Sequence, residues 1–414
     1  MLAAGARRPL GDLGPARSRH NWARSTVIVA DGSVLVGGPD GRVAAFASGA
    51  ESEPRWTSER SQGYVVSLSA GEGRVAVGSR GADAGVSLLR STTGAQRWSQ
   101  AATRHVGTAA DDSLLAQPYV IDVGVAGGAV TGDDVIVAAI RRHERSGGDR
   151  SWSSAVLGFD PGGGVRWRHA ADASPAALDI DAGRVAVAYN RRPGDGDGLV
   201  VLDAATGDGL FSWDPDGSGD RRVGDVAFTE QGIAVASHAD KRGYLLTIDG
   251  TEQWRVGLGT PRSVGSETVY TYPNHVSAAD GRAVFVTGNT FAASTRDPDA
   301  RHPAEHTVTA VAGGSVAWDH AIGGFARDVS SSGSKIAVPS AQHFRRRDAD
   351  THAVHVFDAR DGHLAERSIA GIASSAAIGD RTLAAVEEPV AYHDEKLTRG
   401  DHRLHTWPIE APER

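Results

Sequence analysis

The sequence predicts an all-β fold: a ring of eight four-stranded antiparallel sheets, or β-propeller, with a seven-bladed ring as the alternative. Short apolar strands separated by Asp-Gly and Thr-Gly turns recur along the chain, and a Trp ends six of the repeated units. Units of roughly 40 to 50 residues with four strands each are typical of propeller blades. One small sheet cannot bury both of its faces, so such units must stack side by side.

The repeat is clearest around residues 184–213. Residues 184–189 alternate between the two faces of a strand, and residues 199–202 form a second apolar run. A third run, residues 210–213, follows an Ala-Thr-Gly-Asp-Gly turn, and residues 176–180 supply a strand before the first. These residues therefore predict one complete blade.

The same order of strands and turns divides the chain into eight units. The units span residues 25–56, 63–98, 134–167, 176–213, 223–254, 275–318, 328–367 and 374–407. Six of them end at Trp56, Trp98, Trp167, Trp213, Trp254 and Trp318, whereas the seventh lacks this Trp. The eighth unit reaches only its third strand.

Residues 1–22 carry no repeat and are predicted to form an N-terminal arm, and residues 23–414 a single propeller domain. Because the eighth unit lacks a fourth strand, we expect the N-terminal residues to supply it and to close the ring. No helix longer than two turns and no interdomain linker is predicted.

Composition excludes several classes of function. The chain has 414 residues, a formal net charge of −8 and a pI of about 6.0, which argues against a broad nucleic-acid-binding surface. It has no Cys, which removes disulfides, thiolate metal sites and Cys nucleophiles. Only three basic residues are Lys, and Asp outnumbers Glu by 36 to 15. This bias indicates either GC-rich coding or adaptation to high salt.

The sequence also bears on location. No stretch of apolar residues is long enough to cross a membrane, and residues 1–20 lack the apolar core of an export signal. We therefore expect a soluble, cytoplasmic protein without a membrane span. The alternative is that the start codon is wrongly assigned and that an export signal is hidden for this reason.

The long polar insertions are predicted to lie on one face of the ring, together with the connections between blades. They comprise residues 141–153, 190–198, 237–243, 287–307, 339–352 and 387–402. Long loops on a rigid scaffold often carry binding residues, and Arg and His favour anionic groups. The predicted contacts on this face are Arg191, Arg192, His238, His343 and Arg346. A plain solvated surface, with weak Arg–Asp pairs, is the alternative.

A second group of candidates is expected beside the central channel. If His275 opens the innermost strand of the sixth unit, then Tyr272 and His275 face the channel, with Asn289 at the end of the next strand. Such a group is either a polar anchor for a ligand or a structural cluster whose hydrogen bonds are satisfied internally.

Two short motifs match metal sites. Residues 214–225 fit a calcium loop whose ligands would be Asp214, Asp216, Ser218, Asp220 and Asp225. The flanking segments are strands, however, and an ordinary turn between blades explains the same residues. The HPAEH segment at 302–306 fits a zinc-hydrolase motif that requires a helix. Pro303 and the strand-like residues that follow argue against that helix, so we expect a polar loop.

The segments VVLDAATGDGLFSW (200–213), LLRSTTGAQRW (88–98) and LTIDGTEQW (246–254) resemble the quinoprotein-type repeat, and the resemblance extends over about residues 26–407. That family includes PQQ-dependent dehydrogenases and non-enzymatic scaffolds such as the lipoprotein BamB. The resemblance implies that the six Trp residues dock neighbouring blades. Many of the dehydrogenases carry adjacent cysteines, which this chain lacks, so the scaffold branch is favoured. The Arg-rich, Asp-rich composition resembles haloarchaeal cytoplasmic members.

The sequence thus predicts a non-catalytic scaffold that binds a protein partner or a small anionic ligand on its loop-rich face, as a monomer or within a hetero-complex. The alternative is an enzyme that uses a metal ion, Ca²⁺ or Zn²⁺, or a quinone in the central channel. No catalytic residue and no nucleic-acid partner is predicted. No cofactor is assigned; Ca²⁺ and PQQ are the alternatives raised by the acidic loop and the resemblance.

Overall fold

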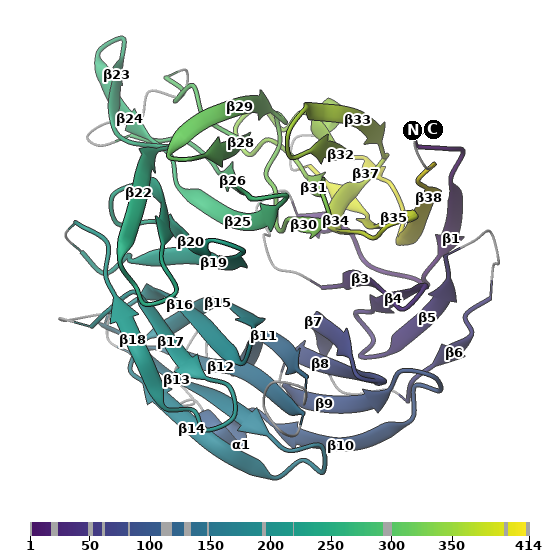
Figure 1. The fold of residues 1–414 in the computed structure, drawn as a ribbon. Coiled ribbons are helices and arrows are strands. Elements are labelled where there is room, and N and C mark those ends of the chain that lie inside the picture. The colour runs from purple at the N-terminus through teal and green to yellow at the C-terminus, as the bar shows by residue number, and fades with distance from the viewer. Residues whose placement is uncertain are drawn as a thin grey trace.

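The chain folds into a ring of antiparallel sheets around a central channel, which confirms the predicted all-β propeller (Figure 1). The computed structural model describes residues 2–17, 24–48, 53–59, 63–81, 83–108, 118–127, 134–146, 149–192, 196–217, 219–292, 300–392 and 396–410. Within these residues the main strands group into eight four-stranded units, which we call blades 1 to 8 in chain order.

The strands of each blade are given from the channel outward. Blade 1 contains β3 (Thr26–Ala30), β4 (Ser33–Gly37), β5 (Val43–Ala47) and β6 (Trp56–Thr57). Blade 2 contains β7 (Tyr64–Gly71), β8 (Arg74–Arg80), β9 (Gly85–Arg90) and β10 (Gln96–Ala101). Blade 3 contains β11 (Tyr119–Ala126), β12 (Val135–Ser146), β13 (Asp149–Phe159) and β14 (Val165–Ala171). Blade 4 contains β15 (Ser174–Asp181), β16 (Arg184–Arg191), β17 (Leu199–Asp203) and β18 (Gly209–Trp213).

The second half of the ring follows the same plan. Blade 5 contains β19 (Val223–Thr229), β20 (Gly232–Ser237), β21 (Arg242–Leu246) and β22 (Glu252–Gly257). Blade 6 contains β25 (Pro273–Ala279), β26 (Arg282–Thr287), β28 (Thr307–Ala312) and β29 (Ser315–Ala321). Blade 7 contains β30 (Ser330–Ser332), β31 (Lys335–Ser340), β32 (Ala353–Asp358) and β33 (Gly362–Ser368). Blade 8 contains β34 (Ile372–Ile378), β35 (Thr382–Glu388), β38 (Arg403–Pro408) and β1 (Ala6–Pro9).

Smaller elements occupy the connections. One three-stranded sheet contains β2 (Ala16–Arg17), β36 (Val390–Ala391) and β37 (Thr398–Arg399), and another contains β23 (Arg262–Val264), β24 (Glu267–Tyr270) and β27 (Phe291–Ala292). The helices are a single turn, α1 (Thr103–Val106), and the 3₁₀ helix η1 (Ala349–Thr351). In the part of the chain that the structure describes, no helix is long and apolar enough to cross a membrane.

The two ends of the chain meet in blade 8. Strand β1 pairs antiparallel with β38 from Ala6 opposite Thr406 to Pro9 opposite Arg403. The N-terminal residues therefore form the outermost strand of the last blade, and the chain closes the ring without a covalent link (Figure 1).

Both faces of each blade are buried, which explains the continuous apolar runs in the sequence. In β17, Val200 and Leu202 pack with residues of blade 3, whereas Leu199 and Val201 pack with residues of blade 5. Side chains of a strand alternate between its two faces, so one run of four apolar residues serves two interfaces.

A Trp on the outer strand of one blade packs against a glycine in the outer turn of the next. Gly207 has a φ of 75°, and a Cβ added to it would lie 2.6 Å from the ring of Trp167. The indole Nε1 of Trp167 also donates to the carbonyl of Ala204 at 2.9 Å. The same pairing joins Trp56 to Gly94, Trp98 to Gly163, Trp254 to Gly314 and Trp318 to Gly362.

Trp213 does not occupy this position, although it does pack against the next blade as expected. In blade 4 the ring against the next glycine, Gly250, belongs to Phe211. Phe211 lies four residues after its own turn glycine, Gly207, which is the spacing found for Trp98, Trp167, Trp254 and Trp318. Trp213 lies two residues further on and packs edge-on against Tyr244, at 4.9 Å between ring centroids.

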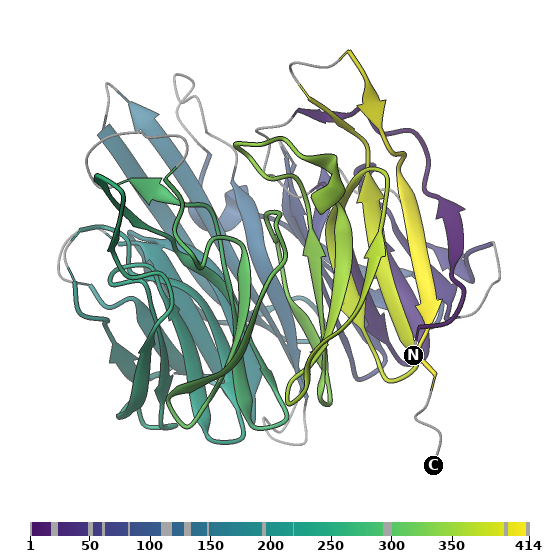
Figure 2. The same ribbon diagram turned by 90° about the horizontal axis from the view of Figure 1, so that it is seen from above.

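The two faces of the ring differ (Figure 2). One carries tight turns such as Asp31-Gly32, whose positive φ values of 48° and 68° suit a two-residue hairpin. The other carries the connections between blades and the long insertions, and we call it the loop face. Segment 141–153 is not the loop we predicted there. Strands β12 and β13 continue to pair through it, and His143 stacks on Trp152 at 5.3 Å.

Candidate functional site

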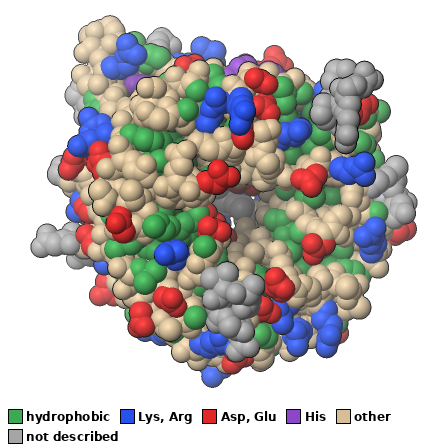
Figure 3. Space-filling model, in the orientation of Figure 1, with side chains coloured by type: hydrophobic (Ala, Val, Ile, Leu, Met, Phe, Trp, Pro, Cys, Tyr) green, Lys and Arg blue, Asp and Glu red, His purple; other side chains and the backbone are tan. Residues whose placement is uncertain are grey.

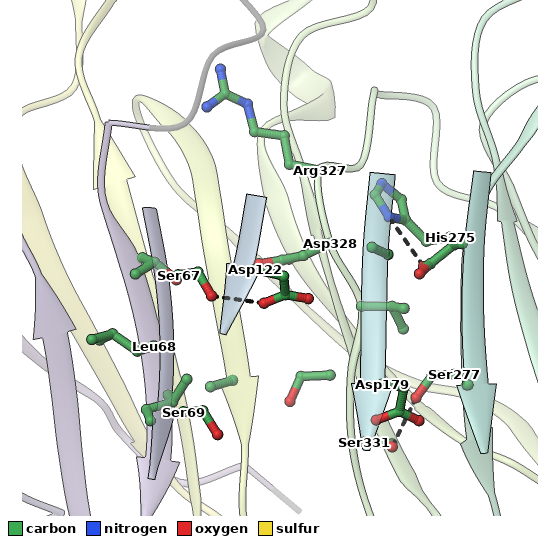
Figure 4. Close-up of a pocket in the computed structure, with 18 of the residues that line it drawn as sticks. Ser67, Leu68, Ser69, Asp122, Asp179, His275, Ser277, Arg327, Asp328 and Ser331 are labelled. Atoms are coloured by element: carbon green, nitrogen blue, oxygen red, sulfur yellow. Dashed lines mark hydrogen bonds and ion pairs between the residues drawn. The ribbon is translucent and has the colours of Figure 1, made fainter. Parts of the chain in front are cut away.

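A channel of about 750 Å³ runs along the ring axis and is lined by the first strands of the blades. Seen from the side of the tight turns, it is a hollow at the centre of the molecule, with carboxylate side chains nearby (Figure 3). Four lining residues are acidic: Asp122, Asp179, Asp225 and Asp328. Figure 4 shows Arg327 at one end of the cavity, beyond Asp122 and Asp328.

The channel carboxylates join several pairs of neighbouring blades. Asp179 of blade 4 accepts the backbone N–H of Phe228 in blade 5 at 2.7 Å. Asp225 of blade 5 accepts the N–H of Val276 in blade 6 at 2.9 Å. Further bonds of this kind run from Ser67 Oγ to Asp122, at 2.7 Å, and from Ser375 Oγ to Asp328, at 2.8 Å. These acids therefore link the inner strands of neighbouring blades.

Burial raises the pKa of Asp122, Asp179 and Asp328 to about 6, although hydrogen bonds from the neighbouring blades act in the opposite direction. A channel with this many carboxylates does not fit PQQ, which is itself a tricarboxylate, so we derive no step through it. Among the described residues, the channel acids do not form a group of three close enough to share a metal ion.

Cationic side chains gather at the loop-face end of the channel. We call Arg80, Arg141, Arg191, Arg221, Lys241 and Arg327 the cationic mouth. They come from blades 2, 3 and 4, from the connections that lead into blades 5 and 7, and from the loop after β20. The ring closure brings them together although they are far apart in sequence.

Tyr119, the first residue of β11, organises one side of the mouth. The guanidinium carbons of Arg80 and Arg141 lie 5.3 Å and 4.5 Å from its ring. Arg141 also donates to the Tyr119 hydroxyl and to Ser174 Oγ. Burial lowers the pKa of Arg80, and the positive charges of Arg141 and Arg327 lower it further.

Tyr272 organises the opposite side. Arg221 lies 4.8 Å above its ring, and Lys241 lies 5.1 Å from the ring of Tyr270. Burial lowers the pKa of Arg191, with a further contribution from Arg221. In the described part of the chain, no carboxylate lies within ion-pair distance of Arg141, Arg191 or Arg221. Aromatic rings and hydroxyl groups therefore position Arg141 and Arg221.

His238 packs beneath this side of the mouth. Its ring lies 4.8 Å from that of Tyr272, and its Nδ1 is 3.2 Å from Asn190 Oδ1. Burial, followed by the charge of Arg221, lowers the pKa of His238 to about 3. The imidazole is therefore neutral at physiological pH.

The predicted contact residues separate into groups. Arg191, His238 and Tyr272 meet at the cationic mouth. His275 lines the channel, where its Nε2 is 3.3 Å from the carbonyl of Ala326 and its Nδ1 is 3.7 Å from Asp225. Arg192 lies apart from these residues and covers the ring of Tyr189 at 5.0 Å.

His343 and Arg346 line a smaller pocket of about 230 Å³ between blades 6 and 7, and Asn289 contacts one of its lining residues, His306. Here His306 Nε2 lies 2.8 Å from Asn289 Oδ1, and His343 lies 3.7 Å from Glu305. Glu305 and His306 come from the HPAEH segment, which forms turns rather than a helix.

The charges of this pocket are largely balanced. Hydrogen bonds and the neighbouring histidines hold the pKa of Glu305 at about 2 against the effect of burial, and burial lowers that of His306 to about 4. Both nitrogens of His306 already face acceptors, because its Nδ1 is 3.1 Å from the carbonyl of Gly323. Arg301 lies 3.3 Å from His343, which disfavours a cation here.

The predicted calcium ligands are not brought together. Asp214 pairs with Arg222 at 3.0 Å, and Asp216 pairs with Arg255 at 2.7 Å. Asp225 faces the channel, Asp220 is exposed, and Ser218 lies outside the described residues. The loop therefore fits the alternative explanation, an ordinary connection between blades.

Sequence reasoning missed Tyr119, Arg80, Arg221 and Arg327. Each stands at the loop-face end of an inner strand or of its neighbour. The signal that could have revealed them is an aromatic residue just before an apolar inner strand, as in Tyr119 and Tyr272, together with Arg at the ends of adjacent strands.

No known protein family and no curated protein matches this sequence. Solved structures do match. BamB from Moraxella catarrhalis shares 13% identity at a TM-score of 0.57, over 94% of this chain and 95% of that one. Quinohemoprotein alcohol dehydrogenase from Comamonas testosteroni shares 12% identity at a TM-score of 0.61, over 100% of this chain and 78% of that one. The computationally designed Ika8 protein shares 13% identity at a TM-score of 0.58, over 97% and 99% of the two chains. At these identities the likeness concerns architecture, and the chain has the β-propeller fold of BamB and of the quinohemoprotein alcohol dehydrogenase.

Proposed function

We propose that this propeller is a non-catalytic binding protein that holds an anionic group at the cationic mouth on its loop face. One observation carries the proposal. Arg141, Arg191 and Arg221 converge on the mouth, and among the described residues no carboxylate forms an ion pair with them.

The electrostatics of the mouth favour an anion. The positive charge of Arg221 adds to burial in lowering the pKa of Arg191, against the effect of Asp220, and both guanidinium side chains lie partly out of water. An anion between them would relieve this repulsion and accept charge-assisted hydrogen bonds. The channel acids lie deeper, so they would repel an anion that moved further in and would confine it to the mouth.

The anionic group has two sources of the same chemistry: a small carboxylate or phosphate, or an acidic segment of a partner protein. The long insertions of the chain lie on the same face of the ring as the mouth (Figure 2). Tyr119, Tyr270 and Tyr272 fix the cations before binding, which lowers the entropic cost of ordering them.

Isothermal titration calorimetry tests the proposal with inorganic phosphate, citrate and a capped oligoglutamate peptide. The variant is Arg191→Gln/Arg221→Gln. Its control, Arg184→Gln/Arg381→Gln, removes the same charge at the tight-turn end of β16 and in the turn after β34. A hydrogen bond to a charged group contributes about 1.5–3 kcal/mol, so the mouth variant should bind at least about tenfold more weakly.

The control variant should bind like the wild type. Tighter binding of phosphate or citrate identifies a small ligand, whereas tighter binding of the peptide identifies a partner segment. Equal weakening in both variants, or no saturable binding of any of the three anions, would refute the proposal.

A further inference from the structure

A cluster of three histidines lies between the outer strands of blades 6 and 7, away from the cationic mouth. His320 comes from β29, His355 from β32 and His363 from β33. One ring nitrogen of each lies within 4.8 Å of one ring nitrogen of both others. The rings of His320 and His363 are parallel and 4.2 Å apart.

The strand register explains why these side chains converge. In β33, His363 pairs with Phe357 and Glu366 pairs with His355. Cross-strand partners share a face of the sheet, but residues 363 and 366 are an odd number apart and would normally face opposite ways. A bulge in β33 adds one residue between them, so His355, His363 and Glu366 all face blade 6.

Blade 6 supplies the third histidine through its docking strand. Trp318 stacks on Phe357 at 5.5 Å and donates to the carbonyl of Ala359 at 2.8 Å, which fixes β29 against blade 7. His320 is two residues further along β29 and faces the same way. Phe357 forms the apolar floor of the cluster, since it lies 5.6 Å from His320 and 5.3 Å from His363.

The central ligand candidate, His355, is buried without its hydrogen bonds. It is 4% exposed, and neither ring nitrogen has a hydrogen-bond partner among the described residues. Leaving a buried polar group unsatisfied costs about 1–3 kcal/mol. A metal ion would satisfy one nitrogen, and Glu366, 3.7 Å from His355 Nδ1, stands near the other as an outer partner.

The charges around the cluster also suit a cation. Glu366 lies 3.7 Å from His355 Nδ1, and Asp319 adjoins His320 in β29. The Glu305/His306/His343 group differs, because Arg301 adjoins it.

We propose that His320, His355 and His363 bind a divalent transition-metal ion, Zn²⁺ foremost, that joins blade 6 to blade 7 at the rim of the ring. Three imidazoles with a fourth position open to water are a known donor set for zinc. The half-buried and exposed positions of His320 and His363 give the ion a path from solvent.

The test uses the full chain, stripped with EDTA and titrated with ZnCl₂ by calorimetry and with CoCl₂ by visible absorption. We expect one saturable equivalent, Co²⁺ ligand-field bands that Zn²⁺ abolishes, and a higher melting temperature with Zn²⁺. Removing a residue that hydrogen-bonds to a metal ligand typically weakens metal binding roughly 10- to 100-fold. His363→Ala and His320→Ala each remove a direct ligand, so they should weaken Zn²⁺ binding at least as much.

Two controls locate the ion. His169→Ala removes a partly buried histidine from the outer strand β14, and His343→Ala disrupts the other candidate group. Both should bind Zn²⁺ like the wild type, and the metal-free melting temperature of each variant shows that it is folded. Undiminished Zn²⁺ binding in His363→Ala, a loss confined to His343→Ala, or no saturable binding in the wild type would overturn the proposal.

Discussion

The docking of Trp167 on Gly207 predicts a large effect from adding one methyl group. Gly207→Ala would place a Cβ 2.6 Å from the Trp167 ring at a φ of 75°. A left-handed backbone costs a residue other than Gly about 1–2 kcal/mol. Forcing an extra methyl group into a packed interface adds about 1–3 kcal/mol. Alanine also lowers the conformational entropy of the unfolded chain, which offsets about 0.4–1 kcal/mol of this destabilisation.

The net destabilisation of Gly207→Ala is therefore about 2–4 kcal/mol. Gly209→Ala is the matched control two residues away, because no atom lies within 4 Å of its Cβ and its φ is not positive. The control should change the free energy of unfolding by less than about 0.5 kcal/mol. Urea denaturation of both variants, followed by circular dichroism, measures the difference. If Gly207→Ala unfolds at the same urea concentration as the control, the docking contact does not hold the blades together.

Three further predictions follow from the ring. Deletion of residues 1–10 removes β1 and exposes the edge of β38, so the melting temperature should fall, and an unchanged value would mean that ring closure by β1 adds no stability. The pKa of His238 is about 3, below its ordinary 6.5, so the unfolded state takes up a proton first and stability falls as the pH drops below 6.5. Between pH 7 and pH 5 the free energy of unfolding of His238→Phe should therefore fall by about 2 kcal/mol less than that of the wild type. Equal decreases, measured by urea denaturation at the two pH values, would contradict the argument that burial keeps His238 neutral. The pKa of Asp179 is raised to about 6, so the folded state holds its proton longer and this group destabilises the fold as the pH rises from 4 to 6. Asp179→Asn keeps an acceptor for Phe228 and should be more stable than the wild type by about 1–3 kcal/mol at pH 7.5 but not at pH 4; a difference independent of pH would count against this.

Much of the fold could be predicted because each blade is specified by short-range patterns in the sequence. Turn pairs such as Asp31-Gly32 and apolar runs such as 199–202 depend on residues that are neighbours in the chain. The exception at Trp213 could also have been predicted, since Phe211, and not Trp213, lies four residues after the turn glycine Gly207. Residue type alone was the weaker guide, because the position relative to the turn decides which ring reaches the next blade.

Segment 141–153 shows why a prediction from a single stretch of sequence can fail. Its composition is that of a polar loop, but cross-strand partners such as His143 and Trp152 extend the hairpin. The calcium-loop interpretation of residues 214–225 is disfavoured for a related reason, because Arg222 and Arg255 form ion pairs with Asp214 and Asp216. Pairing across strands and blades is not visible in a single stretch of sequence.

The candidate site was predicted only in part. Arg191, His238 and Tyr272 do meet, yet Arg192, the next residue after Arg191, lies elsewhere because successive side chains of an extended chain face opposite ways. The mouth as a whole depends on the curvature of the closed ring, which brings Arg80 and Arg327 to one opening. The three-histidine cluster depends on a bulge and on the alignment of two blades, and no spacing in the sequence reveals either.

The claim that the mouth holds an anion is tested most directly by locating one. Crystals of the full chain soaked in selenate, a phosphate-like anion with an anomalous scatterer, would show its position. The account predicts an anomalous peak between Arg191 and Arg221 on the loop face, which disappears in Arg191→Gln/Arg221→Gln. A peak elsewhere on the molecule with none at the mouth would contradict it.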